Sequence, residues 1–65
     1  MVKLVIRHDK EYDDWMVIWY DGGKIIERKT YHAYGDKQDA IDTMRQMYLK
    51  EREKGKSIQA DPLYM

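Results

Sequence analysis

Two adjacent glycines between two apolar runs constrain the fold of this chain more than any other feature. Residues 14–20 carry six consecutive apolar or aromatic side chains after Asp14, a pattern typical of a strand, and Gly22 and Gly23 follow after Asp21. Glycine tolerates the positive φ angles that tight hairpin turns require. The pair therefore predicts a hairpin whose returning strand lies within residues 24–34 and ends near His32.

The remaining elements follow from the pattern of apolar residues. In residues 1–7, Val2, Leu4 and Ile6 alternate with Lys3, Val5 and Arg7, which predicts a strand. The polar stretch 8–13 predicts the loop that joins this strand to residues 14–20.

A helix is predicted after the third strand. Asp36 is a typical N-cap, Asp39 lies in the first turn, and Gly55 is typical of a helix end. Between them, apolar residues recur at spacings of three and four: Ala40, Ile41, Met44, Met47 and Tyr48. The expected fold is α+β, with a three-stranded antiparallel sheet followed by one C-terminal helix (β-β-β-α) in residues 1–55 and a short tail in 56–65.

Composition limits the classes of protein that fit. A chain of 65 residues makes one small domain, and the absence of cysteine excludes a disulfide scaffold and a thiolate nucleophile. Twelve basic and twelve acidic side chains give a net charge of zero, which weakens a nucleic-acid hypothesis. No apolar run approaches the roughly 20 residues of a membrane span, and residues 1–7 lack the apolar stretch typical of a signal peptide. We expect a cytoplasmic protein that does not bind a membrane.

Chemistry-bearing residues are scarce. The few hydroxyl residues lie in no nucleophile setting, and His8 and His32 have no partner at metal-ligand spacing. The acidic loop with Asp9, Glu11, Asp13 and Asp14 lacks a calcium-binding pattern and is expected to be solvated. We therefore expect no catalytic residues, metal, cofactor or small-molecule substrate.

The predicted sheet has two apolar faces but one helix to cover them. One face collects Met16, Ile18, Tyr20, Ile25, Glu27, Lys29 and Tyr31, and the other collects Trp15, Val17, Trp19, Ile26, Arg28, Thr30 and His32. The sequence does not decide which face the helix covers. An uncovered face would form an interaction site, unless its aromatics only fill the core and the tail 62–65 folds back over it.

These faces supply the candidates for binding. Trp, Tyr and Arg dominate protein interfaces, so the predicted contacts to a protein partner or a second copy in a homodimer are Trp15, Trp19, Arg28, Tyr20, Tyr31 and Tyr64. The alternative is nucleic acid, with Arg28, Lys29, Thr30 and His32 as contacts, assisted by the helix cations.

Residues 15–40 combine Trp15, the turn Tyr20-Asp21-Gly22-Gly23-Lys24, an aromatic at Tyr31 or Tyr34, and a helix start at 36–40. This combination resembles the AP2-like, three-stranded DNA-binding domains of phage and transposon integrases. The resemblance implies an open sheet face that enters the DNA major groove through Arg28, Thr30 and His32. In contrast to that family, this hairpin is not strongly basic. The uncharged, cysteine-free design is also similar in style to small bacteriophage accessory or inhibitor proteins, many of which bind a host protein.

Overall fold

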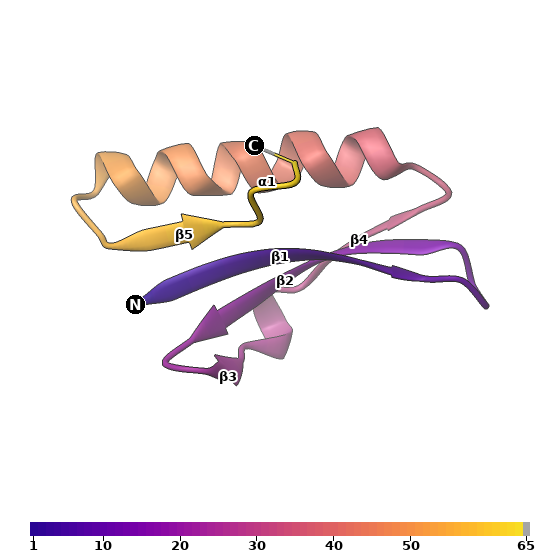
Figure 1. The fold of residues 1–65 in the computed structure, drawn as a ribbon, viewed down its shortest axis with the longest axis horizontal. Helices are drawn as coiled ribbons and strands as arrows, with labels where there is room; N and C mark the ends of the chain where they lie inside the picture. The colour runs from indigo at the N-terminus through magenta and orange to yellow at the C-terminus, as the bar shows by residue number, and fades with distance from the viewer. Residues whose placement is uncertain (65) are drawn as a thin grey trace.

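Five strands and one α-helix account for most of residues 1–64, the part of the chain that the computed structural model describes (Figure 1). The elements, in chain order, are β1 (Val2–Asp9), β2 (Asp14–Asp21), β3 (Lys24–Ile25), the 3₁₀ turn η1 (Glu27–Lys29), β4 (Tyr31–Tyr34), α1 (Lys37–Glu53) and β5 (Ile58–Ala60). The α+β class and the hairpins are confirmed. The sheet, however, is mixed and larger than the expected three antiparallel strands.

The two long strands form the centre of the sheet. β1 and β2 pair antiparallel over their full lengths, from Val2 opposite Asp21 to Asp9 opposite Asp14. β2 continues into β3 through Gly22 and Gly23, whose φ angles of 59° and 84° suit a tight turn. The glycine pair thus closes the hairpin that the sequence predicts.

The returning strand is broken, which corrects the predicted faces. Were it continuous, Val17 would pair with Arg28, but it pairs with Tyr31 because the η1 turn inserts three residues. Backbone bonds from Lys29 N to Ile26 O and from Thr30 N to Glu27 O form this turn. An odd insertion reverses the alternation of side chains. Tyr31 therefore lies on the same face as the tryptophans, and His32 lies on the face of Met16.

The helix α1 forms as the sequence predicts. The carboxylate of Asp36 accepts a hydrogen bond from the backbone N–H of Asp39 at 2.9 Å, and Gly55 adopts a φ of 77° just beyond the C-cap Lys54. Its apolar stripe packs on one sheet face. No helix within residues 1–64 is long and apolar enough to cross a membrane.

The segment after the helix adds a strand, where the sequence suggested only a tail. β5 pairs parallel with β1, with Ile58 opposite Val2 and Ala60 opposite Leu4. The chain then turns back beside the helix, where Tyr64 packs against the core and its carbonyl accepts a bond of 3.2 Å from Nε of Arg45 (Figure 1). Residues 61–64 thus do not fold over the face opposite α1. Met65, the last residue of the predicted tail, lies outside the described residues.

The core lies between α1 and one face of the sheet. It buries eight apolar residues: Leu4, Ile6, Val17, Trp19, Ala33, Ala40, Ile41 and Met44. Full burial of a side chain such as Leu4 or Val17 stabilises the fold by roughly 1.5–3 kcal/mol. The helix therefore covers the tryptophan face and leaves the other face of the sheet without a helix.

Candidate functional site

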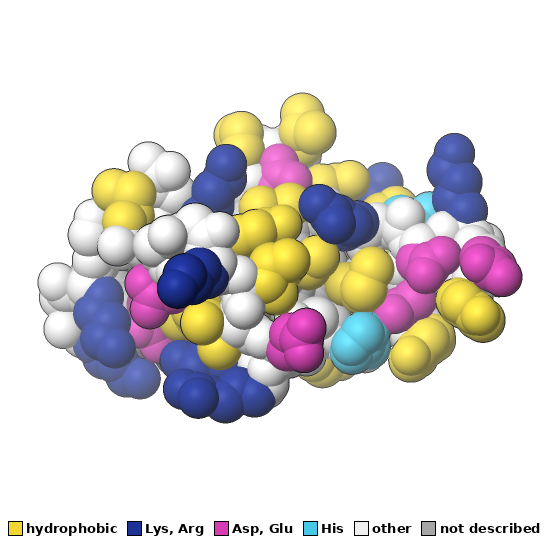
Figure 2. Space-filling view, turned by 90° about the horizontal axis from the view of Figure 1, so that it is seen from below, with side chains coloured by type: hydrophobic (Ala, Val, Ile, Leu, Met, Phe, Trp, Pro, Cys, Tyr) yellow, Lys and Arg dark blue, Asp and Glu magenta, His cyan; other side chains and the backbone are white. Residues whose placement is uncertain are grey.

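The candidate site is the sheet face turned away from α1, which we call the open face (Figure 2). Strand alternation and register place the following side chains on it: Lys3, Val5, Arg7 and Asp9 from β1, Asp14, Met16, Ile18 and Tyr20 from β2, Ile25 from β3, His32 and Tyr34 from β4, and Gln59 from β5. Figure 2 shows an apolar area in the middle of this face, bordered by cationic side chains and, in places, by acidic and histidine side chains.

The apolar middle of the open face follows from the pairing of β1 with β2. Val5 lies opposite Ile18, which also has Met16 and Tyr20 as neighbours on its own strand. Ile18 is only 5% exposed, so these neighbours shield it from water without a second layer above them. Ile25, opposite Tyr20 on β3, remains 48% exposed. This area thus presents apolar surface to solvent.

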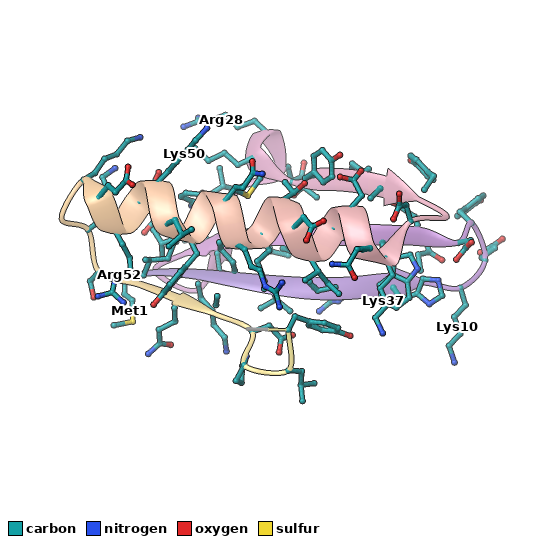
Figure 3. All side chains as sticks on the ribbon, turned by 90° about the horizontal axis from the view of Figure 1, so that it is seen from above. Met1, Lys10, Arg28, Lys37, Lys50 and Arg52 are labelled. Carbon is teal, nitrogen blue, oxygen red and sulfur yellow. The ribbon has the colours of Figure 1, made fainter. Side chains whose placement is uncertain are left out.

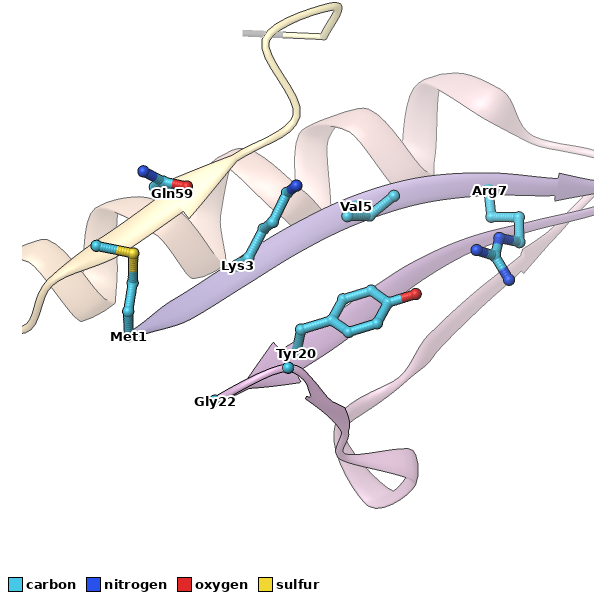
Figure 4. Close-up of a pocket in the computed structure, with 8 residues that line it drawn as sticks. Met1, Lys3, Val5, Arg7, Tyr20, Gly22 and Gln59 are labelled. Atoms are coloured by element: carbon cyan, nitrogen blue, oxygen red, sulfur yellow. The ribbon is translucent and has the colours of Figure 1, made fainter.

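Two cations border this apolar area. Lys3 and Arg7 point to the same side of β1 as Val5, which lies between them (Figure 4). Neither forms an ion pair with any of residues 1–64. Their charges are therefore not neutralised by a partner within the described part of the chain.

A hollow of about 580 Å³ lies between these cations and the β2–β3 turn (Figure 4). Its lining consists of Met1, Lys3, Val5, Arg7, Tyr20, Gly22, Gly23 and Gln59. The two glycines carry no side chain that would fill this space. The lining offers donors from Lys3, Arg7, Tyr20 and Gln59, and it contains no carboxylate.

A buried aspartate fixes His32 at the β4 side of the open face. Nδ1 of His32 donates to Oδ2 of Asp14 at 2.6 Å, and the imidazole stacks on Tyr34 with 5.9 Å between ring centroids. Asp14 is 5% exposed, whereas His32 is largely exposed. The pair therefore orients the imidazole toward solvent.

The residues predicted as protein contacts are distributed over both faces. Tyr20 lies on the open face. Trp19 is 6% exposed under α1, and Nζ of Lys29 lies 4.2 Å from the centroid of its ring. Trp15 also lies on the helix side, where it stacks on His8 at 4.1 Å.

The other three predicted protein contacts lie away from the open face. Tyr31 is on the helix side and donates to Oδ2 of Asp39 at 2.7 Å. Tyr64 packs on the core beside α1, and Arg28 is exposed in η1. The structure thus brings only Tyr20 of the six together with the apolar area.

The residues predicted to contact nucleic acid are also separated. Arg28 and Lys29 belong to η1, Thr30 is half-buried after it, and His32 lies on the open face. The helix cations do not all lie on that side. Figure 3 shows Lys50 on the same side of α1 as Arg28, and Arg52 on the opposite side.

Two carboxylates of the first loop, Asp9 and Asp13, contact other groups of the chain. Asp9 accepts from the backbone N–H of Glu11 at 3.1 Å, and Asp13 lies 2.8 Å from Nε2 of His8. Among residues 1–64 no group of three or more His, Asp or Glu side chains is placed to hold a metal ion.

Known proteins give no guide to this site. No family model matches the chain, and neither a curated protein nor a solved structure matches it.

Sequence reasoning missed Lys3, Val5 and Arg7 as site residues. Their alternation with Val2, Leu4 and Ile6 was visible, and it placed them together on one side of a strand. Because the sequence does not reveal which side the helix covers, this signal could not distinguish a binding face from the core.

Proposed function

We propose that this chain is a small, non-enzymatic binding module that contacts a protein partner through its open face. The observation that carries the proposal is an apolar area, formed by Val5, Tyr20 and Ile25, bordered by Lys3 and Arg7, which form no ion pair with residues 1–64. An uncovered apolar area with a polar rim is typical of protein interfaces. The cytoplasm is the location we propose for this activity.

The composition of the open face supports a protein partner. Tyrosine and arginine are enriched among residues that dominate binding energy, and Tyr20 and Arg7 lie on this face. Unpaired charges at the rim of an interface mainly steer association and select partners with opposite charge. The partner is either a different protein or a second copy of this chain.

Capture from a lysate of the source organism tests the proposal. We expect the wild-type chain to retain a specific protein, and Ile25→Asp to lose it because Ile25 lies on the open face. The matched control is Leu49→Asp, which places the same charge on an exposed side chain of α1 that is 58% exposed. Equal retention by both variants would contradict a role for the open face.

The homodimer version has a separate test. Light scattering over a range of concentrations should show a mass above 7.9 kDa if the open face binds a second copy. A monomer at all concentrations would exclude this version and leave a different protein as the partner.

DNA binding is the second candidate function, as the resemblance to AP2-like domains suggests. The observation in its favour is that Arg7, Met16 and His32 lie in one row across three strands, so two groups able to contact phosphate share the open face. Retention on a DNA column at about 50 mM salt that disappears at moderate salt would support it. No retention at the lower salt concentration would exclude it.

A further inference from the structure

The hollow on the open face combines positive charge with a regular spacing of side chains along β1. Lys3, Val5 and Arg7 are alternate residues of one strand, so they lie on one side of β1 at intervals of about 6.6 Å, and the two cations are about 13 Å apart. Half-buried Val5 supplies the apolar surface between the cations, and Ile18, opposite it on β2, is buried beneath.

No acidic side chain in the lining of the hollow balances the positive charge of Lys3 and Arg7. Its lining contains Lys3 and Arg7 but no Asp or Glu. Carboxylates on or next to the open face, outside the lining, already accept hydrogen bonds: Asp9 from the backbone N–H of Glu11, Asp14 from His32, and Asp61, which follows β5 beside Leu4, from the backbone N–H of Leu63. The hydroxyl of Tyr20 and the amide of Gln59 add neutral donors to the lining. The hollow is therefore complementary to carboxylates.

We infer that the hollow binds an extended acidic segment of the protein partner, with the pattern acidic-x-apolar-x-acidic. An extended chain laid along β1 repeats its side chains at the same interval as β1 itself. Its two carboxylates then face Lys3 and Arg7, and the apolar side chain between them packs on Val5 beside Tyr20, both of which line the hollow. This inference rests on the proposed function and names the chemistry of the partner.

The apolar surface between the cations favours a peptide over nucleic acid. A phosphate backbone would place charged groups over Val5, which offers no donor to replace the lost water. A leucine or similar side chain in the same place gains from burial instead.

Titration with a synthetic peptide tests the inference. The probe is a peptide that contains Glu-Ser-Leu-Ser-Glu between glycines. Its binding is followed through the amide chemical shifts of the full chain. We expect shifts concentrated in β1 and β2 near Lys3, Val5 and Tyr20. The double variant Lys3→Glu/Arg7→Glu should weaken binding by about tenfold or more, because two favourable charge contacts become repulsive.

Control variants and peptides distinguish the inference from general charge attraction. Lys10→Glu/Lys50→Glu makes the same change in net charge at exposed sites outside the hollow, and it should keep the affinity within about twofold. A rearranged peptide, Glu-Glu-Leu-Ser-Ser, should bind more weakly than the probe. Circular dichroism of each variant checks that the fold is intact.

Several results would overturn the inference. These are equal binding of the rearranged peptide, no binding of the probe, preferential binding of a DNA oligonucleotide, or occupation of the hollow by a second copy of the chain. If Ile25→Asp abolishes capture of the partner while the probe does not bind, the inference fails and the proposed function stands. If Ile25→Asp also has no effect on capture, both fail.

Discussion

Asp14 is buried at the rim of the open face, and its one side-chain partner within residues 1–64 is His32. Oδ2 accepts from Nδ1 of His32, while Oδ1 is buried with no hydrogen-bond partner among these residues. A buried carboxylate is costly when it loses its donor. At the residue scale, this pair therefore fixes both the edge of β4 and the orientation of the imidazole.

Removal of the imidazole should destabilise the fold. We expect His32→Ala to lower the free energy of unfolding by about 1–3 kcal/mol, because Asp14 keeps its charge without a donor. Chemical denaturation measures this change. The double variant Asp14→Asn/His32→Ala should lose less than the two single variants added together, since no charge is left unpaired. Additive losses would contradict the coupling.

A second prediction at the residue scale concerns Tyr31. The hydrogen bond that its hydroxyl donates to Asp39 raises the pKa of Tyr31 above the ordinary value of 10.0. Because the pKa is higher in the folded state, this bond stabilises the fold below the ordinary tyrosine pKa, and the contribution is lost as pH rises through the raised value. Absorbance titration should show one tyrosine that ionises after the exposed ones, and Tyr31→Phe should remove that component. An unchanged titration curve would contradict the assignment.

The elements differ in how far their own residues determine them. Asp36, Gly55 and the apolar stripe of α1 are local signals, and each appears in the structure in its predicted role. The Gly22-Gly23 turn is equally local. For these elements the neighbouring residues contain the information, so sequence reasoning was sufficient.

Other elements depend on contacts that the sequence does not display. Glu27, Arg28 and Lys29 are compatible with an exposed strand, but the fold places them in η1, because this lets Ile26 and Tyr31 both pack toward the core. β5 exists because Ile58 pairs with Val2, a residue more than fifty positions away. Which face of the sheet α1 covers, and therefore where the candidate site lies, depends on these long-range contacts. It could not be predicted from the neighbouring residues alone.

The N-cap of α1 gives a prediction at the scale of the element. Asp36→Ala should lower the free energy of unfolding by about 0.5–2 kcal/mol, because the backbone N–H of Asp39 loses its acceptor. Asp36→Asn should retain most of the stability, since asparagine caps as well as aspartate. Denaturation curves of the two variants check this, and equal losses would contradict the capping role.

At the scale of the whole molecule, charge is distributed along the longest axis, which measures 36 Å. The acidic loop between β1 and β2 lies at one end, and the C-terminal turn of α1, with Lys50 and Arg52, lies at the other (Figures 2 and 3). Although the net charge is zero, acidic and basic side chains are thus concentrated at opposite ends of the molecule. Such polarity orients an approaching partner, and the hollow with Lys3 lies toward the basic end.

The two faces of the sheet have separate roles in this account. The helix face holds the tryptophans and supplies the core, whereas the open face presents Val5, Tyr20 and Ile25 beside Lys3 and Arg7, which have no ion pair in the described part of the chain. This division explains why Trp15, Trp19 and Tyr31, which the sequence predicts as interface residues, pack in or against the core instead.

Site-specific photo-crosslinking tests this division most directly. A photoreactive amino acid replaces Ile25 on the open face in one variant and Leu49 on the outer surface of α1 in another, two positions of similar exposure. With the partner present, we predict a crosslinked complex from position 25 and none from position 49. Crosslinks from position 49 alone would contradict the central claim that the open face binds the partner.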